Sequence, residues 1–211
     1  MPAIVPIRSL GAEQRDRITA HLLALDAQDR YLRFGYPATD EHIRRYMAGL
    51  NFERDEVFGI FNRRLELLAV AHLARYEAAE YRGCAEFGVS VAAHARGRGY
   101  GTRLFERAAM HARNDGVQVL YVHALSQNAA MLHIAQKAGA EFKRDGVESE
   151  AHLTLPAATL DSRLAEIVQE QFAQADYRLK VQQRQLQLWM DCLQPWTDLA
   201  AASLRAATHR H

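Results

Sequence analysis

The chain has 211 residues, of which about half are hydrophobic, and a formal net charge of +1. This length fits one domain with an added segment or two small domains, and the apolar fraction is sufficient for a substantial core. The near-zero charge argues against a nucleic-acid or membrane partner bound by strong electrostatics, and no apolar run reaches the roughly 18 residues of a membrane span. Cys84 and Cys192 are far apart and form no disulfide or metal-binding pattern. We therefore expect a cytoplasmic protein without a metal, and without a nucleic-acid or membrane partner.

The first part of the chain mixes strand and helix patterns in short segments. In chain order it predicts a strand at 4–8, a helix over 12–25, a turn from Asp26 to Arg33, a helix capped by Asp40, and a hairpin of strands at 56–61 and 65–76. The second part predicts a central strand at 117–125, a helix over 129–138, and strands at 140–144 and 147–155 around the turn Asp145-Gly146. This order indicates an α/β (α+β) fold, in which a mixed sheet carries helices on both faces.

Between these two parts lies a strand, a glycine-rich turn and a helix. Phe87, Val89 and Val91 alternate as in a strand, Gly97, Gly99 and Gly101 follow, and helical spacing begins near Leu104. The backbone N–H groups in the first turn of a helix have no intrahelical partners, and the helix dipole adds partial positive charge there. Glycines allow a ligand to approach the backbone closely, and Arg96 and Arg98 add positive charge. The stretch therefore predicts an anion site suited to a pyrophosphate.

Two other glycine-rich motifs match this stretch less well. A Walker A loop requires a Gly-Lys-Ser/Thr sequence, and no lysine lies near. A dinucleotide fingerprint has Gly-x-Gly-x-x-Gly and an acidic residue at the end of the second strand, whereas the last spacing here is one residue shorter and that acid is missing.

The same residues carry a family resemblance. Arg96-x-x-Gly99-x-Gly101, directly after a Val-x-Val strand, resembles the pyrophosphate-binding signature of the GNAT-type N-acetyltransferases, and Asn128 with Lys137-x-Gly139 resembles a second segment of that family. The likeness covers roughly residues 3–155. It implies a mixed, mostly antiparallel sheet and acetyl-CoA as the acyl donor. The cofactor-binding residues that it implies are Val89 and Val91, whose backbone would polarise the thioester carbonyl, and Arg96, Gly97, Arg98, Gly99, Tyr100, Gly101, Thr102 and Asn128.

Glu86 is the best candidate for the catalytic base. It lies in the strand before the glycines, on the face opposite Phe87, and burial in a strand raises the pKa of a carboxyl group. Some members of the family have a glutamate at about this position. The alternative is a strand residue that faces solvent. For the acid, the family often has a tyrosine seven residues after the asparagine, but Ala135 stands there. His133 is a weaker candidate on another helix face, His123 fits a core histidine better, and water is a further proton source.

The resemblance implies transfer of an acetyl group to an amine by direct attack in a ternary complex. The acceptor stays open between a small-molecule amine and a protein lysine. Arg30, Tyr31, Arg33 and Tyr36 occupy the region that helps to line the acceptor site in the family, although a polar surface turn explains them equally well. The alternative function is a non-catalytic acyl-CoA-binding module, regulatory or scaffolding, that is oligomerised by its C-terminal helix.

The sequence after Pro156 differs from the rest and divides the chain into a GNAT-like domain at 1–155 and a helical extension at 156–211. Residues 160–193 lack Gly and Pro and carry an apolar seam with heptad-like steps. The seam comprises Val168, Phe172, Ala175, Leu179, Gln182, Leu186, Trp189 and Leu193. We expect a long helix that Pro195 ends, followed by a short amphipathic piece at 196–207. The seam predicts a homodimer, with packing onto the chain's own domain as the alternative.

Overall fold

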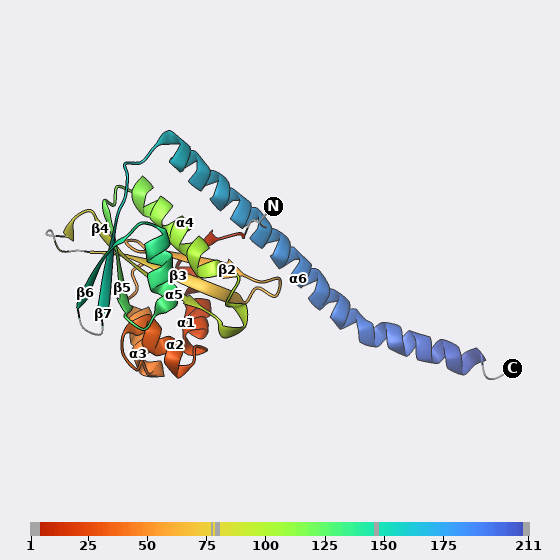
Figure 1. Ribbon diagram of the computed structural model, residues 1–211. Coiled ribbons are helices and arrows are strands. Elements are labelled where there is room, and N and C mark those ends of the chain that lie inside the picture. Colours follow the sequence, from red (N-terminus) through yellow and green to blue (C-terminus); the bar gives the residue numbers. More distant parts are fainter. Residues whose placement is uncertain (1–4, 77, 79–80, 146–147, 209–211) are drawn as a thin grey trace.

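A seven-stranded sheet forms the centre of the computed structural model (Figure 1). The structure describes residues 5–76, 78, 81–145 and 148–208, without the side chains of residues 144, 145, 148 and 191–208. The strands are β1 (Arg8–Ser9), β2 (Glu56–Phe61), β3 (Leu67–Arg75), β4 (Cys84–Val91), β5 (Val119–Leu125), β6 (Glu141–Asp145) and β7 (Glu148–Thr154). Their spatial order is β1-β2-β3-β4-β5-β7-β6, and only the β4–β5 pair is parallel. The mixed, mostly antiparallel sheet is therefore confirmed.

Helices cover both faces of the sheet, as predicted. One face carries the 3₁₀ turn η1 (Ala12–Gln14), α1 (Arg15–Leu23), α2 (Ala27–Phe34) and α3 (Asp40–Gly49), and the other carries α4 (Tyr100–Asn114) and α5 (Ala129–Lys137). A second short turn, η3 (Ala93–Ala95), links β4 to the glycine stretch. Each face has its own apolar core: Phe87 and Phe105 pack together under α4, and Ile18, Ile43 and Met47 pack under α1 and α3. Strands β2 and β3 contribute residues to both cores, whereas Ala85 and Phe87 of β4 belong to the core under α4.

Several predicted boundaries change for local reasons. The first strand is only Arg8–Ser9, so the prediction of 4–8 was wrong, and residue 4 lies outside the described part. The predicted turn after Asp26 is helix α2, whose Asp29 N–H donates to the Asp26 carboxylate. Helix α3 is capped by Thr39 instead of Asp40, because the Thr39 hydroxyl accepts the N–H of His42. The turn predicted at Asp145-Gly146 includes residues outside the described part.

The C-terminal helix α6 (Leu160–Thr208) is longer than predicted. Its 49 residues span about 70 Å, and the helix extends well beyond the sheet (Figure 1). Pro195 does not end it, and the short separate piece expected at 196–207 is part of the same helix. A proline removes one backbone hydrogen bond and costs roughly 3 kcal/mol inside a helix. The helix continues through Pro195 despite this cost, so the predicted stop was wrong.

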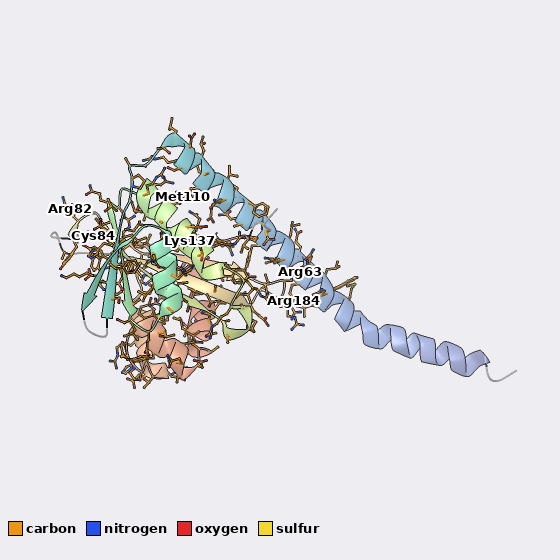
Figure 2. All side chains as sticks on the ribbon, in the orientation of Figure 1. Arg63, Arg82, Cys84, Met110, Lys137 and Arg184 are labelled. Carbon is orange, nitrogen blue, oxygen red and sulfur yellow. The ribbon has the colours of Figure 1, made fainter. Side chains whose placement is uncertain are left out.

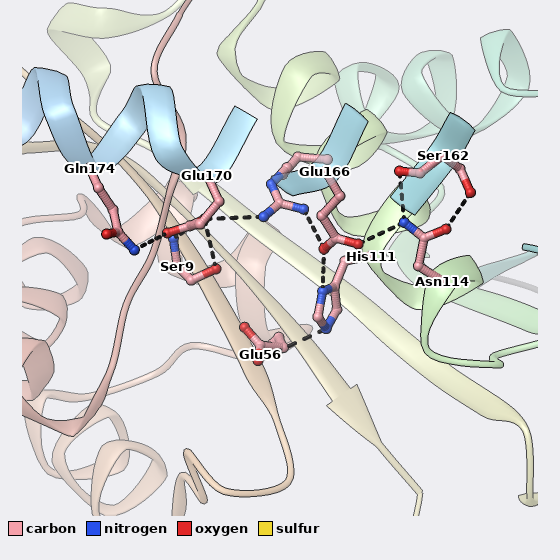
Figure 3. Close-up of polar contacts among 9 residues, drawn as sticks. Ser9, Glu56, His111, Asn114, Ser162, Glu166, Glu170 and Gln174 are labelled. Atoms are coloured by element: carbon pink, nitrogen blue, oxygen red, sulfur yellow. Dashed lines mark hydrogen bonds and ion pairs between the residues drawn. The ribbon is translucent and has the colours of Figure 1, made fainter. Parts of the chain in front are cut away.

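The first half of α6 docks on α4 through polar side chains (Figure 3). Arg107, which is buried, donates to Glu166 over 2.7 Å and to Glu170 over 3.1 Å. His111 and Asn114 also donate to Glu166, over 2.6 and 2.7 Å. Burial opposes ionisation of Glu166, but the hydrogen bonds from His111, Asn114 and Arg107 outweigh it and lower the pKa of Glu166 to about 2. The contact thus depends on a charged carboxylate.

The docked face of α6 is distinct from its apolar seam. Ser162, Glu166, Glu170 and Ala173 face the domain, and farther along Lys180 donates to the carbonyl of Phe61. The helix leaves the domain near the β2–β3 turn, where Arg184, labelled in Figure 2, lines a shallow pocket together with Arg64 and Leu65. The described seam side chains are exposed: Val168, Phe172, Ala175, Leu179, Gln182, Leu186 and Trp189. Packing of the seam onto this domain, the alternative from the sequence, is therefore not what the structure has.

Candidate active site

Strands β4 and β5 separate partway along their length. They pair from Cys84 to Glu86 of β4, opposite Val119 to Tyr121 of β5, and no pairing continues beyond Glu86. From Phe87 onward the β5-side edge of β4 is therefore open. On its other edge β4 stays paired with β3 as far as Val91.

The open edge exposes two backbone donors. The N–H of Ala92, the residue after β4, donates to the carbonyl of Leu68 in β3, so it points away from β5. Because successive residues of a strand alternate their hydrogen-bonding side, the N–H groups of Val89 and Val91 point the other way, into the gap between β4 and β5. These are the two residues whose backbone was predicted to polarise a thioester carbonyl.

The glycine stretch leads into an uncapped helix. Gly97 and Gly99 have φ values of 74° and 73°, a region that other residues adopt only under strain. Gly99 is the N-cap of α4, and no side chain caps the helix. The first N–H groups of α4, from Tyr100 to Thr102, therefore keep their hydrogen bonds for a ligand. Gly101 serves packing, since a Cβ there would lie 3.1 Å from Cδ1 of Ile134 on α5.

A cavity of about 440 Å³ connects these features. It runs from the open edge of β4 to the start of α4, with α5 and α2 as further walls. Of the predicted cofactor residues, it is lined by Val89, Val91, Arg96, Gly97, Gly99, Tyr100, Gly101, Thr102 and Asn128. Arg98 is not part of the lining, and its guanidinium instead donates to the carbonyl of His94. The structure thus brings together nearly the whole predicted donor site.

Helix α2 is attached to both sides of this cavity. Asp29 forms an ion pair with Arg96 of the glycine stretch. On the opposite side, the Asn128 amide donates to the carbonyl of Leu32 over 3.3 Å, while its oxygen accepts the N–H of Met131 and caps α5. Two side chains predicted to contact a cofactor therefore also hold α2 in place across the cavity.

Glu86 lies at the last paired position of β4, where the gap begins. Its carboxylate accepts a hydrogen bond of 3.2 Å from the Tyr76 hydroxyl, and its strand partner in β5 is Tyr121. Burial, and then the neighbouring negative charge of Glu86, raise the pKa of Tyr76. The face predicted for Glu86 is confirmed, since Phe87 packs on Phe105 of α4, whereas Gly88 and Ser90 meet Arg33 and His21 from α2 and α1.

Two histidines complete the walls of the cavity, and Ala135 is not part of its lining. Ala135, at the position where the family often has a tyrosine, is fully buried. His133 is exposed on another face of α5 and lines the cavity. His123 is also exposed and lines the cavity, so its prediction as a core histidine was wrong. The gap that begins after the Glu86–Tyr121 pair lies beside this part of β5, and His123 faces the cavity there.

A polar chain behind β4 was not predicted from the sequence. Arg33 donates to the Tyr46 hydroxyl over 3.0 Å, and Tyr46 lies 2.7 Å from Nδ1 of His72. Nε2 of His72 lies 3.3 Å from the buried carboxylate of Asp55. Burial, and then the positive charge of Arg33, lower the pKa of His72 to about 4. The imidazole is therefore neutral at pH 7. If Nδ1 accepts the Tyr46 proton, the ring N–H is on Nε2, which lies near Asp55 without forming a well-aligned hydrogen bond.

Within the part of the chain that the structure describes, no group of three or more His, Cys, Asp or Glu side chains is arranged to hold a metal ion. The helices of the same part include none that is both long enough and apolar enough to cross a membrane.

Comparison with known proteins identifies the family. The family model of the acetyltransferase (GNAT) domain matches residues 7–141, well over half of the chain. The chain therefore belongs to the GNAT acetyltransferase family. A search of curated proteins finds no significant match to the sequence.

Solved structures share the fold at low sequence identity. The GNAT domain of S. lividans PAT has 20% identity and a TM-score of 0.61, with 71% of this chain and 89% of that one covered. An N-acetyltransferase from Staphylococcus aureus has 19% identity and a TM-score of 0.58, with 73% and 100% covered. A phosphinothricin acetyltransferase from Sinorhizobium meliloti, solved in complex with acetyl-CoA, has 15% identity and a TM-score of 0.59, with 74% and 89% covered.

Proposed function

We propose that this protein transfers an acetyl group from acetyl-CoA to an amine by direct attack in a ternary complex. The observation that carries the proposal is the gap between β4 and β5, which opens onto the uncapped start of α4 within one cavity. The pyrophosphate would bind the N–H groups at the start of α4, and the pantetheine arm would run along the open edge of β4. Membership of the GNAT acetyltransferase family and a fold neighbour solved with acetyl-CoA support this donor.

The residues around the gap supply the chemical steps. The amine nitrogen attacks the thioester carbonyl carbon, and the negative charge that develops on the carbonyl oxygen is stabilised by the N–H of Val89 or Val91. Glu86 accepts the proton that the amine gives up. The C–S bond then breaks, and CoA leaves as a thiolate. Since Ala135 carries no ionisable group, solvent protonates this good leaving group.

Release of free CoA tests the proposal. The full chain is incubated with acetyl-CoA and a panel of amines, amino acids and lysine peptides, while a thiol reagent reports CoA and mass spectrometry reports the acetylated product. We expect CoA release that depends on at least one acceptor and matches product formation. Tight acetyl-CoA binding without turnover on any acceptor would contradict transfer and favour the non-catalytic acyl-CoA-binding module.

For α6 we propose self-association of two copies through its apolar seam. Phe172, Leu179, Leu186 and Trp189 are 46%, 59%, 56% and 63% exposed, although they follow one another at heptad-like steps. The polar face of the same helix is already used by the contact with α4. A second copy carries the same seam and would bury both seams by coiled-coil packing, which is the self-complementary arrangement of a two-fold dimer.

Matched charge substitutions test this dimer. Light scattering of the full chain should give twice the chain mass, and Phe172→Glu or Leu186→Glu should shift it towards the monomer. The neighbouring exposed glutamines provide controls, because Gln171→Glu and Gln185→Glu add the same charge beside the seam and should leave the dimer intact. A monomeric wild type, or a dimer that survives both seam substitutions together, would refute association through α6.

A further inference from the structure

The guanidinium of Arg33, on α2, packs against β4 at Gly88, where any larger residue would collide with it. A Cβ at Gly88 would lie 2.7 Å from Cζ and Nη1 of Arg33 and 2.8 Å from its Nη2. These similar distances show that the guanidinium lies flat over the backbone of residue 88. Gly88 and Arg33 both line the cavity, at the level where β4 has just separated from β5. A positive charge is thus placed beside the reaction site.

The guanidinium has little to neutralise it. Its partner is the neutral hydroxyl of Tyr46, and its Cζ lies 5.2 and 5.6 Å from the ring centroids of Phe34 and Tyr46. Among the side chains that the structure describes, no carboxylate forms an ion pair with Arg33. A half-buried guanidinium usually pairs with an anion, since its fork of N–H donors matches a carboxylate. The nearby acid Asp55 is already bound by Arg54 and by the backbone of Arg75.

The position of Arg33 separates it from the phosphates of the donor. The phosphate site is the glycine stretch and the start of α4, which follow β4 in the chain. Arg33 instead stands on the α2 face of β4, the same face as Glu86, and Glu86 and Gly88 are two residues apart, or roughly 7 Å along the strand. A base and a fixed cation therefore flank one place on this face.

We infer that Arg33 binds a carboxylate of the acceptor, so that the preferred acceptors are amino acids or other small amines with a carboxylate a few bonds from the reacting nitrogen. Glu86 then faces the amine while Arg33 holds the carboxylate. A lysine side chain in a protein carries no carboxylate near its amine, and its positive charge would approach Arg33 without compensation. The inference rests on the proposed function for the identity of the reaction.

Acceptors in matched pairs test the inference. The pairs are L-phenylalanine with phenethylamine and L-leucine with isoamylamine, in which only the carboxylate differs. We expect the wild type to favour the amino acid in kcat/KM, and Arg33→Gln to lower this preference by about tenfold to a hundredfold, mainly through the KM of the amino acid. Arg33→Lys keeps the charge without the fork and should fall in between.

Two further variants separate binding from structure. Gly88→Ala should push the flexible guanidinium away and reduce the preference for the carboxylate while Arg33 is still present. Arg44→Gln removes an exposed arginine of α3 and serves as the charge control, with no expected change in preference. Acetyl-CoA affinity, measured by calorimetry, should be the same in all variants. A large loss of that affinity in Arg33→Gln would overturn the inference and assign Arg33 to the donor.

Binding without turnover keeps the two proposals distinguishable. Calorimetry of the CoA-loaded protein with N-acetyl-L-phenylalanine and with N-acetylphenethylamine measures the carboxylate contribution directly. We expect the wild type to bind N-acetyl-L-phenylalanine more tightly than N-acetylphenethylamine. In Arg33→Gln the two ligands should bind equally weakly. If no amine is acetylated, the proposed function fails, but this measurement still shows whether Arg33 binds a carboxylate. If amines are acetylated without regard to a carboxylate, the inference alone fails.

Discussion

The β5-side edge of β4 and its α2 face border the same cavity, but the edge presents backbone groups to it and the face presents side chains. The edge offers backbone N–H groups of Val89 and Val91 and continues into the uncapped start of α4. The face offers side chains: Arg33 lines the cavity, Glu86 lies at the last paired position of β4 next to the lining residue Phe87, and Tyr46 and His72 lie behind Arg33. The edge therefore depends on backbone geometry, and the face depends on charge.

We expect donor selection to depend on the backbone at the edge and acceptor selection to depend on side chains of the face. Backbone donors respond little to pH and to single side-chain changes, which suits the binding of acetyl-CoA. Charged side chains respond strongly to pH and to single substitutions, and one substitution at a time can adapt them to another acceptor. Substitutions on the face should therefore change rates and pH dependence, whereas substitutions at the edge should change acetyl-CoA affinity.

The largest effect is expected for Glu86→Gln. Loss of the proposed base should lower kcat by about 10²- to 10⁴-fold and leave acetyl-CoA affinity unchanged. Steady-state kinetics over a range of pH, with calorimetry for the donor, measure both. Glu106→Gln, an exposed acid on α4, is the control and should retain full activity. Full activity of Glu86→Gln at every pH would exclude Glu86 as the base.

The next effect concerns the acid sensitivity of the α2 face. The pKa of His72 is about 4 in the folded protein and near 6.5 in the unfolded chain, because burial and then the charge of Arg33 disfavour the imidazolium. A lowered pKa gives stability that is present above pH 6.5 and lost as the pH falls towards 4. The shift corresponds to about 3 kcal/mol of unfolding free energy.

Urea denaturation at pH 7, 5.5 and 4.5 measures this loss. Other groups titrate in the same range, so the comparison is with His72→Gln, whose stability should fall less steeply over the same interval. Asp55 and Arg54, which also face the imidazole, stay charged throughout it, since burial of Asp55 is outweighed by hydrogen bonds that lower its pKa. Parallel curves for the two proteins would show that His72 does not carry the acid sensitivity.

A smaller effect is expected at the donor edge. Gly99→Ala places a side chain at φ 73°, which costs about 1–2 kcal/mol, and disturbs the N–H groups at the start of α4. Acetyl-CoA affinity should fall about tenfold. Gly116→Ala is the matched control, because φ is 81° there and open space surrounds the new Cβ at both positions. It should lose similar stability in thermal denaturation without any change in affinity.

The same contrast explains what the sequence could predict. The donor site is nearly contiguous, from Val89 to Thr102, and its glycines are required by local backbone geometry, so a motif reveals it. The fold class was predictable for the same reason, because the spacing of apolar residues along the sequence reveals local strands and helices. The α2 face instead joins Arg33, Tyr46, His72 and Glu86 from four elements, and only the tertiary structure brings them together.

Some signals on the α2 face were present in the sequence without being decisive. Gly88 stands between Phe87 and Val89 within a strand, and a glycine within a strand indicates close approach of another group. Which group approaches was not predictable, because Arg33 lies 55 residues away in the sequence. Pro195 is an example of a local signal that misled the prediction. The cost of a proline inside a helix did not end α6, because the residues around it favour a helix.

The smallest expected change reports directly on the arrangement of the α2 face. If Arg33 lies over Gly88 beside His72, its charge contributes to the low pKa of that imidazole. Arg33→Gln should therefore raise the pKa of His72 above about 4, while burial keeps it below 6.5. NMR titration of the imidazole Cε1–H measures the shift, with Arg44→Gln as the control for a general loss of positive charge. An unchanged pKa in Arg33→Gln would remove the guanidinium from the neighbourhood of Gly88, and with it the basis for carboxylate recognition on this face.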